Sequence, residues 1–220
     1  IRRPKPDDFQ IKQAMEKIKK SKKPIIISGG GVFYSDAMDE LGSFAIKHNI
    51  PVTQTVMGYS TMKRDHSHFL GPIGGLGGRA ANNLAKETDL AICVGTKLAD
   101  FTTGSWANFE NPEFKLVSIN IARHDANKHL AEAVIGDAKV CLSELSNSLG
   151  NWKSPDSWHK KSQDELKSWN EYVDKESGPT NQETPNYAHA VGAIYRNSDP
   201  TDIAVTAAGG LVGEVVQVWR

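Results

Sequence analysis

The sequence has no excess of charge of either sign, because 26 lysines and arginines balance 26 aspartates and glutamates among its 220 residues. Nucleic acids and acidic membranes bind through positive charge, so we expect no nucleic-acid partner. The densest basic run, residues 17–23, is typical of a solvated helix end. No signal peptide is visible in these residues, and no apolar run approaches the ~18 residues of a membrane span, so we expect no membrane partner.

Cysteine is scarce as well. Only Cys93 and Cys141 occur, and each lies within an apolar segment. Such cysteines predict small buried side chains rather than a disulfide framework, which favours a reducing, cytoplasmic setting.

Several catalytic and metal-binding patterns are missing. The chain has no G-x-x-x-x-G-K-S/T phosphate loop and no tandem cysteine pair. His66 and His68 share a face of an extended segment but lack a third ligand, and His124, Asp125 and His129 lack metal-ligand spacing. We therefore expect no metal site, and the spacing of residues assigns no catalytic residue to this chain.

An unbroken apolar run is the clearest positive feature. Residues 90–95 are apolar or small without alternation, which predicts a strand buried on both faces, as in a parallel sheet. A polar loop rich in glycine and threonine, residues 95–105, follows this strand. Because open parallel sheets bind ligands beyond the carboxyl ends of their strands, the loop is a candidate binding loop.

Comparable apolar segments recur up to about residue 149, mostly interleaved with helical patterns. The predicted strands are residues 25–28, 51–55, 69–73, 90–94, 115–119 and 133–135. Such alternation predicts an α/β fold with right-handed crossovers. We expect a Rossmann-like open parallel sheet of six strands with helices on both faces, since six units are too few to close a barrel of eight.

Three polar residues mark predicted helix starts. Asp7 and Gln10 have the spacing of a capping box. Ser35 is expected to cap the following helix, and Asp137 the helix after the last strand.

The composition changes after residue 150. Residues 151–184, with aromatic side chains among lysines and acids, predict a partly helical connecting segment, and residues 185–220 predict the start of a second α/β unit. The predicted elements of that unit are a helix over 187–195, a strand over 202–206, a turn at 209–210 and a helix from 213. We expect the chain to be a fragment of a longer protein.

Two glycine-rich turns are candidate phosphate sites. Residues 29–31 follow a strand and precede a helix, where backbone amides can hold phosphate, although a tight turn also explains them. A dinucleotide fingerprint there would need glycine or alanine where the chain has Tyr34. Residues 75–80 match G-x-G-x-x-A, and Arg79 adds a phosphate donor, but the preceding strand pattern is weak.

Seven segments occur together in an informative order. They are residues 24–31 (PIIISGGG), 51–55, 65–71, 75–83, 89–100, 115–121 and 136–139. The series resembles the middle domain of thiamine diphosphate-dependent enzymes of the acetolactate synthase and pyruvate oxidase type, over about residues 1–150. Residues 203–220 look like the start of that family's pyrophosphate-binding domain. Within the family, residues 100–106, 115–120 and 125–129 are most similar to hydrolases of inositol breakdown that cleave a ring C–C bond of a cyclic dione.

The resemblance implies a parent enzyme that uses thiamine diphosphate and Mg²⁺ at sites outside this chain. The activating glutamate of such enzymes lies in the first domain, and the metal-binding Gly-Asp-Gly…Asn motif lies in the third. This chain contains neither the glutamate nor the metal-binding motif, and residues 136–138 (GDA) match that motif only in part. The expected partners are therefore the other domains of the parent and a cyclic dione substrate, in a full-length homo-oligomer, while the fragment itself is structural and not catalytic.

The resemblance also leaves FAD binding open, because some relatives hold FAD at the strand ends of this domain. The positions it implies are Gly30, Gly31, Gly75, Gly77, Gly95, Thr96, Lys97, Asn120, Ile121, Asp137 and Ala138. FAD-holding relatives carry acids where this chain has Asn120 and Ala122, and an alanine cannot accept hydrogen bonds from the adenosine.

Three other interpretations stay open. The first is an acetolactate synthase-like carboligase whose middle domain binds FAD. The second is a non-catalytic nucleotide-binding or architectural module. The third, an NAD-dependent deacylase on a similar sheet, lacks the acidic and histidine positions that we would expect.

Overall fold

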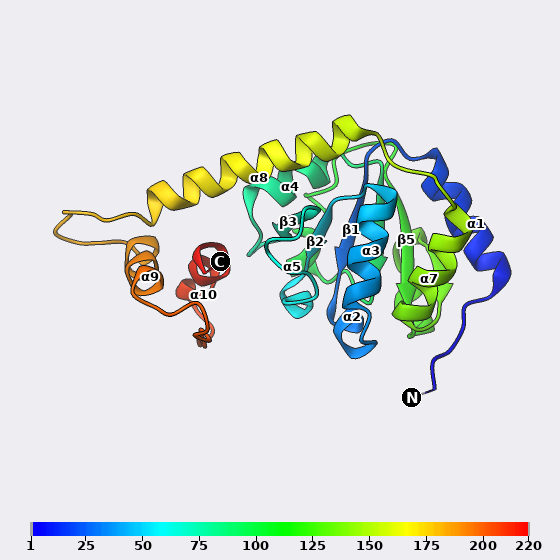
Figure 1. The fold of residues 1–220 in the computed structure, drawn as a ribbon, viewed down its shortest axis with the longest axis horizontal. Helices are drawn as coiled ribbons and strands as arrows, with labels where there is room; N and C mark the ends of the chain where they lie inside the picture. Colours follow the sequence, from blue (N-terminus) through cyan, green and yellow to red (C-terminus); the bar gives the residue numbers. More distant parts are fainter. Residues whose placement is uncertain (1, 220) are drawn as a thin grey trace.

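The computed structural model describes residues 2–219 and contains the predicted six-stranded, all-parallel sheet (Figure 1). Its strands are β1 (Pro24–Ser28), β2 (Val52–Gln54), β3 (Phe69–Pro72), β4 (Leu90–Val94), β5 (Lys115–Asn120) and β6 (Glu132–Ile135). Their order across the sheet is β3-β2-β1-β4-β5-β6. The prediction of a Rossmann-like α/β fold is confirmed.

The chain reverses its direction of travel across the sheet at β1. From β1 it passes to β2 and β3 on one side, and then crosses to β4, β5 and β6 on the other. Ile27 of β1 is in register with Thr53 of β2 and with Cys93 of β4. The carboxyl ends of β1 and β4 therefore form the topological switch point, where doubly wound sheets bind their ligands.

Three helices, α1 (Asp8–Lys20), α3 (Met38–His48) and α7 (Ala138–Leu149), cover one face of the sheet (Figure 1). Ile18, Phe44 and Leu145, one from each helix, are at most 2% exposed and share a cluster with the strands. Full burial of such side chains contributes about 1.5–3 kcal/mol each, so this cluster fixes the three helices on the sheet.

The opposite face is covered by α4 (Arg79–Glu87) and by the first turns of α8 (Asp156–Glu176). The inward side of α4 carries Ala80, Ala81 and Ala85, whose small side chains allow close approach to the strands. Trp158 of α8 is 4% exposed, and its Nε1 donates to the carbonyl of Pro24 at 2.9 Å. That bond attaches α8 to the first residue of β1.

A histidine cluster (His66, His68 and His159) joins the segment before β3 to α8. The rings of His68 and His159 stack with centroids 4.1 Å apart, and those of His66 and His68 are 5.9 Å apart. The Nε2 of His68 donates to Oδ1 of Asn49 at 3.2 Å. Burial lowers the pKa of all three imidazoles, and that of His68 falls to about 4. The cluster therefore packs as neutral rings.

Two of the predicted helix starts are confirmed. Asp7 accepts a hydrogen bond from the amide of Phe9, and Asp137 accepts from two amides in the first turn of α7. The capping box at Asp7 is not completed, because the side chain of Gln10 accepts from the amide of Ile135 instead. Gln10 therefore ties α1 to the edge strand β6.

The prediction that Ser35 caps α3 is wrong. Residues Gly30–Tyr34 already form a short helix, α2, and Ser35 lies at its carboxyl end, so the chain turns again before α3 begins after Ala37. The remaining short elements are η1 (Val56–Gly58), α5 (Asp100–Thr103), α6 (Arg123–Ala126) and η2 (Lys128–Leu130).

The carboxyl-terminal part extends away from the sheet along α8 to α9 (Tyr187–Arg196), and α10 (Gly210–Val218) lies between α9 and the domain (Figure 1). Val173, Val191 and Val218, one from each of these helices, form a small buried cluster. The strand predicted over residues 202–206 is wrong. Ile203 and Val205 are 87% and 90% exposed, and within residues 2–219 no strand lies beside them to pair with. Among the described helices, none combines the length and apolar character needed to cross a membrane.

Candidate functional site

The loops after β1 and β4 are in direct backbone contact at the switch point. A Cβ atom on Gly31 would lie 2.6 Å from the Cα of Gly95, and one on Gly29 would lie 2.4 Å from the carbonyl oxygen of Gly95. Gly95 itself has a φ of 62°, which favours glycine. These glycines are therefore needed for the close approach of two chain segments, whether or not a ligand binds beside them.

The backbone amides of this contact are already engaged. Gly29 donates to the carbonyl of Val94 at 2.8 Å, and Gly31 donates to the carbonyl of Gly95 at 3.0 Å. Gly30 opens α2, and a Cβ there would lie 3.0 Å from the carbonyl oxygen of Met57. The amide of Gly31 therefore bonds to the neighbouring loop and is not free to donate to a phosphate.

Asn120, at the end of β5, joins the neighbouring loops. Its Nδ2 donates to the carbonyl of Thr96 at 3.1 Å, and its Oδ1 accepts from the amide of Ala122 at 3.0 Å. A carboxylate could not donate to Thr96, so the amide side chain suits this internal bond. The structure thus brings Asn120 to Thr96 and to the glycine contact, while Lys97 and Ile121 are exposed beside them.

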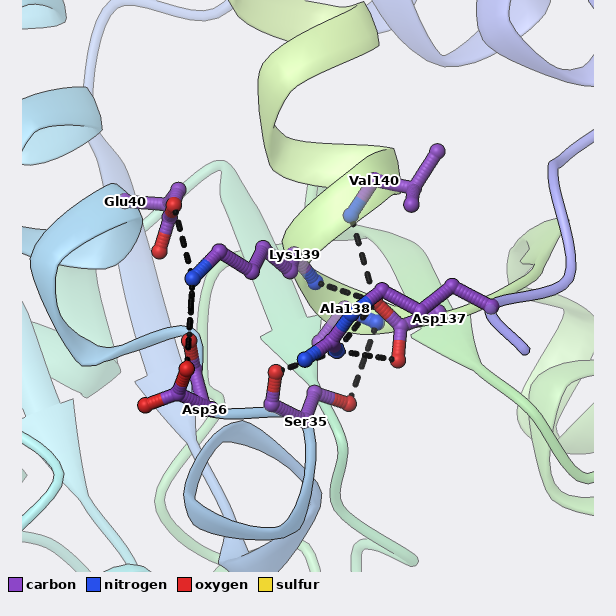
Figure 2. A network of polar contacts seen from close by, with 8 residues as sticks. Ser35, Asp36, Glu40, Asp137, Ala138, Lys139 and Val140 are labelled. Atoms are coloured by element: carbon purple, nitrogen blue, oxygen red, sulfur yellow. Dashed lines mark hydrogen bonds and ion pairs between the residues drawn. The ribbon is translucent and has the colours of Figure 1, made fainter. Parts of the chain in front are cut away.

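Asp137 is fully engaged by the protein itself. It accepts from the amides of Lys139 and Val140 (Figure 2). Its two carboxylate oxygens lie 3.0 and 3.1 Å from an Nη atom of Arg3. The amide of Ala138 donates to the hydroxyl of Ser35 at 3.4 Å. Arg3 was not predicted, because it reaches Asp137 across 134 residues of sequence and belongs to no local motif.

Lys139 extends the same network to the other side. Its ammonium group lies 3.2 Å from Glu40 and 3.4 Å from Asp36, so it links α7 to the loop and helix around α3 (Figure 2). The hydrogen bond to Glu40, followed by that to Asp36, raises the pKa of Lys139. These two ion pairs keep Lys139 charged and hold its ammonium group against carboxylates of its own chain.

The second glycine turn, before α4, also forms internal bonds. Gly75 donates to the carbonyl of Phe101 at 2.7 Å, and Gly77 donates to the carbonyl of Gly74 at 2.8 Å. Asn82 makes a reciprocal pair of bonds with the backbone of Gly74, at 2.9 and 3.0 Å. This turn therefore positions α4 and the loop after β4, and sequence reasoning missed Asn82 because only the fold gives its partner.

Helix α10 covers one end of this turn. Gln217 donates from Nε2 to the carbonyl of Leu76 at 2.8 Å, and its Oε1 accepts from Nε1 of Trp169 at 3.0 Å. Arg64 donates to the carbonyl of Val216 at 3.0 Å. The carboxyl-terminal segment thus binds to the domain through polar contacts near Gly75 and Gly77.

Exposed apolar side chains are carried by the short helices α2, η1 and α5 and by the loops that follow the strands. They are Phe33, Tyr34, Val56, Met57, Tyr59, Phe101 and Ile121, each at least 40% exposed. Soluble proteins rarely leave so many large apolar groups together in water unless another surface covers them. Sequence reasoning missed this apolar edge, because periodicity does not distinguish an uncovered apolar residue from a core residue.

The titratable groups nearby offer no activated nucleophile. Burial raises the pKa of the Cys93 thiol far above its usual range, and burial followed by the charges of Asp137 and Glu144 raises that of Cys141 to about 12. Neither thiol is therefore available as a thiolate nucleophile. Within residues 2–219, no group of three histidine, cysteine, aspartate or glutamate side chains is placed to hold a metal ion.

Comparisons with known proteins agree with this architecture. The family model described as the thiamine pyrophosphate enzyme central domain matches residues 11–145. Three similar proteins, from Clostridium perfringens (strain 13 / Type A), Clostridium botulinum (strain Eklund 17B / Type B) and Bacillus anthracis, are each named 3D-(3,5/4)-trihydroxycyclohexane-1,2-dione hydrolase. Each is 35% identical over 243 residues, which cover 100% of this chain and 38% of the relative. The chain thus spans 38% of the length of these relatives, and it belongs to the family of thiamine pyrophosphate enzyme central domains.

Proposed function

We propose that this chain is the central scaffold of a thiamine diphosphate-dependent hydrolase that opens a trihydroxycyclohexanedione ring in inositol breakdown. The observation that carries the proposal is 35% identity to hydrolases of that name along the whole chain. The alternation of strands and helices and the family match support the same assignment.

The hydrogen bonds of the polar groups at the carboxyl edge support the scaffold role. The side chains of Asn120, Asp137 and Asn82 bond to this chain's own backbone or to Arg3. Thiamine diphosphate supplies an electron sink for C–C bond cleavage. The described residues do not fit the Mg²⁺ that accompanies its pyrophosphate, because they offer no cluster of metal ligands. We propose that other parts of the parent protein hold both groups.

An activity assay tests this proposal directly. The isolated 220-residue chain, mixed with thiamine diphosphate, Mg²⁺ and the dione, is expected to give no turnover, whereas the full-length parent consumes the dione. Turnover by the isolated chain would refute the scaffold role. Acetolactate formation from pyruvate by the parent would instead identify a carboligase, and a parent inert towards both substrates would favour an architectural module.

A second candidate is an acetolactate synthase-like middle domain that binds FAD, which the switch-point position of the glycine loops favours. Its proposed contacts are Gly30, Gly31, Gly75, Gly77, Gly95, Thr96, Lys97, Asn120, Ile121, Asp137 and Ala138. The engaged amides of Gly31 and Gly75 and the Asn120–Thr96 bond weigh against it. We expect FAD to give neither a change in flavin fluorescence nor a thermal shift with this chain, and either signal would support the carboligase.

The exposed apolar edge fits a role among other domains. We propose that the rest of the parent chain covers Phe33, Tyr34 and Met57, which are 56%, 83% and 76% exposed in this structure. The parent would act as a homo-oligomer in the cytoplasm, where two buried free thiols are stable. Sedimentation of the full-length protein tests the oligomer, and a monomer would contradict it.

A further inference from the structure

A lysine-lined cavity of about 630 Å³ lies at the amino-terminal edge of the sheet, opposite the edge described above. Lys17 and Lys20 line it from the last turn of α1, Lys22 from the turn that follows, and Lys115 from the first residue of β5. The sequence predicted a solvated helix end for the first three lysines. The fold adds Lys115, which is distant in sequence, and so gathers four ammonium groups around one hollow.

The lysines of this cavity outnumber the acids around it. Lys17, Lys20, Lys22 and Lys115 stand against Asp89 and Glu113 in the lining, and Lys17 is paired with Glu132 at 3.2 Å. Asp89 accepts from the hydroxyl of Ser21 and from two backbone amides, which fix the carboxylate in place without cancelling its charge. Among the described residues, no ion pair engages Lys20, Lys22 or Lys115. Glu113 is the one other acid in the lining. Lysines without partners attract phosphate groups as point charges.

A second hollow of about 440 Å³ adjoins the first and shares Lys17 and Lys115 with it. Its remaining lining is aromatic or apolar and consists of Trp106, Phe114, Leu116, His129 and Leu130. The rings of Trp106 and His129 are in contact, with centroids 4.4 Å apart. Aromatic surfaces of this kind stack on planar ring systems.

The two loops that form the aromatic hollow are strained. Ser105 and Trp106 have φ values of 52° and 70°, and His129 and Leu130 both have a φ of 58°. Left-handed backbone is unfavourable for bulky residues, and such strain concentrates at ligand clamps. Leu130 is also 98% exposed, so burial within this chain does not compensate for its conformation.

We propose that the two hollows form one binding site for a nucleoside triphosphate, with the phosphates at the lysines and the base against Trp106. The shared Lys17 and Lys115 lie where a sugar and its first phosphate would join the two parts. This site is independent of the proposed hydrolase function. It also lies at the edge of the sheet away from the switch point.

Titration of the 220-residue chain with ATP, followed by tryptophan fluorescence and calorimetry, tests the proposal. ATP should bind more tightly than adenosine or inorganic triphosphate, and its affinity should fall as salt is raised, because exposed charges are screened. Lys115→Glu and Lys20→Glu should each weaken ATP binding by about tenfold, since each reverses a charge beside the phosphates. Trp106→Phe should remove most of the fluorescence change.

The matched control is Lys12→Glu, an exposed position on the same helix outside the cavity. It should keep the wild-type affinity, and circular dichroism melts should show that all the lysine variants fold. Absence of ATP binding would overturn the proposal. So would equal affinity of wild type and Lys115→Glu, which would place the nucleotide elsewhere, or equal affinity for ATP and inorganic triphosphate, which would remove the role of the aromatic hollow.

Discussion

Mild acid should destabilise this protein through His68. The residue is 6% exposed, and burial, followed by the charges of His159 and His66, lowers its pKa from 6.5 to about 4. The neutral ring is satisfied, because Nε2 donates to Asn49 and Nδ1 accepts from the hydroxyl of Ser67 at 2.9 Å. A second proton would remove that acceptor and place a cation against the stacked ring of His159.

The loss of folding stability on acidification can be calculated from proton linkage. In the unfolded chain the pKa of His68 returns to 6.5, so between pH 6.5 and 4 the unfolded state binds more protons than the native state. The contribution of His68 to stability is therefore complete above pH 6.5 and is lost as the pH falls toward 4. From pH 7 to pH 5 the loss is about 2 kcal/mol, or about 4–8 °C in Tm for a chain of this size. His66 and His159, whose pKa values are also lowered by burial, act in the same direction.

Urea denaturation at pH 7 and pH 5 measures this effect. His68→Gln keeps an amide donor for Asn49 but cannot titrate, so the variant should lose about 2 kcal/mol less than the wild type between the two pH values. His124→Gln, an exposed position outside the histidine cluster, is the control and should keep the wild-type loss. Equal losses in the wild type and in His68→Gln would refute the reasoning.

Three further substitutions test the packing of the domain. Asp137→Ala removes two capping bonds and the partner of Arg3, so urea denaturation should give a loss of about 2 kcal/mol that Asp137→Asn partly restores. Trp158→Phe leaves the buried carbonyl of Pro24 without its donor and should cost about 2 kcal/mol by the same measurement, with an unchanged value contradicting the attachment of α8. Gly31→Ala would place Cβ 2.6 Å from Gly95 and should lower Tm by several degrees, whereas Gly75→Ala, whose Cβ would lie 3.7 Å from its nearest neighbour, should change it little.

The sheet could be predicted because each strand carries its own signal. A strand buried on both faces needs an apolar run, and residues 90–94 provide one without reference to any other segment. The helix cap at Asp137 is equally local, since its side chain accepts amides two and three residues ahead. Elements determined by their own residues are therefore the ones that sequence reasoning recovered.

The parts that could not be predicted depend on distant partners. Residues 202–206 have a strand pattern, but a strand requires a neighbour, and none adjoins them in the described chain. The glycine turn at residues 29–31 has a sequence that is also typical of phosphate loops. Only the fold shows its packing contact, because Gly95 is distant in sequence. Arg3 and Lys115 acquire their neighbours only when the sheet brings distant segments together.

Helix α8 also sets a distance. Its 21 residues span about 31 Å, and about 22 Å of that length separates Trp158, on the sheet, from Val173, in the small buried cluster. Removing one residue from its exposed middle would shorten this rod by about 1.5 Å and rotate everything beyond it by about 100°. The length of α8 and the polar contacts of α10 with the domain must therefore match, because both fix the position of the small cluster relative to the sheet.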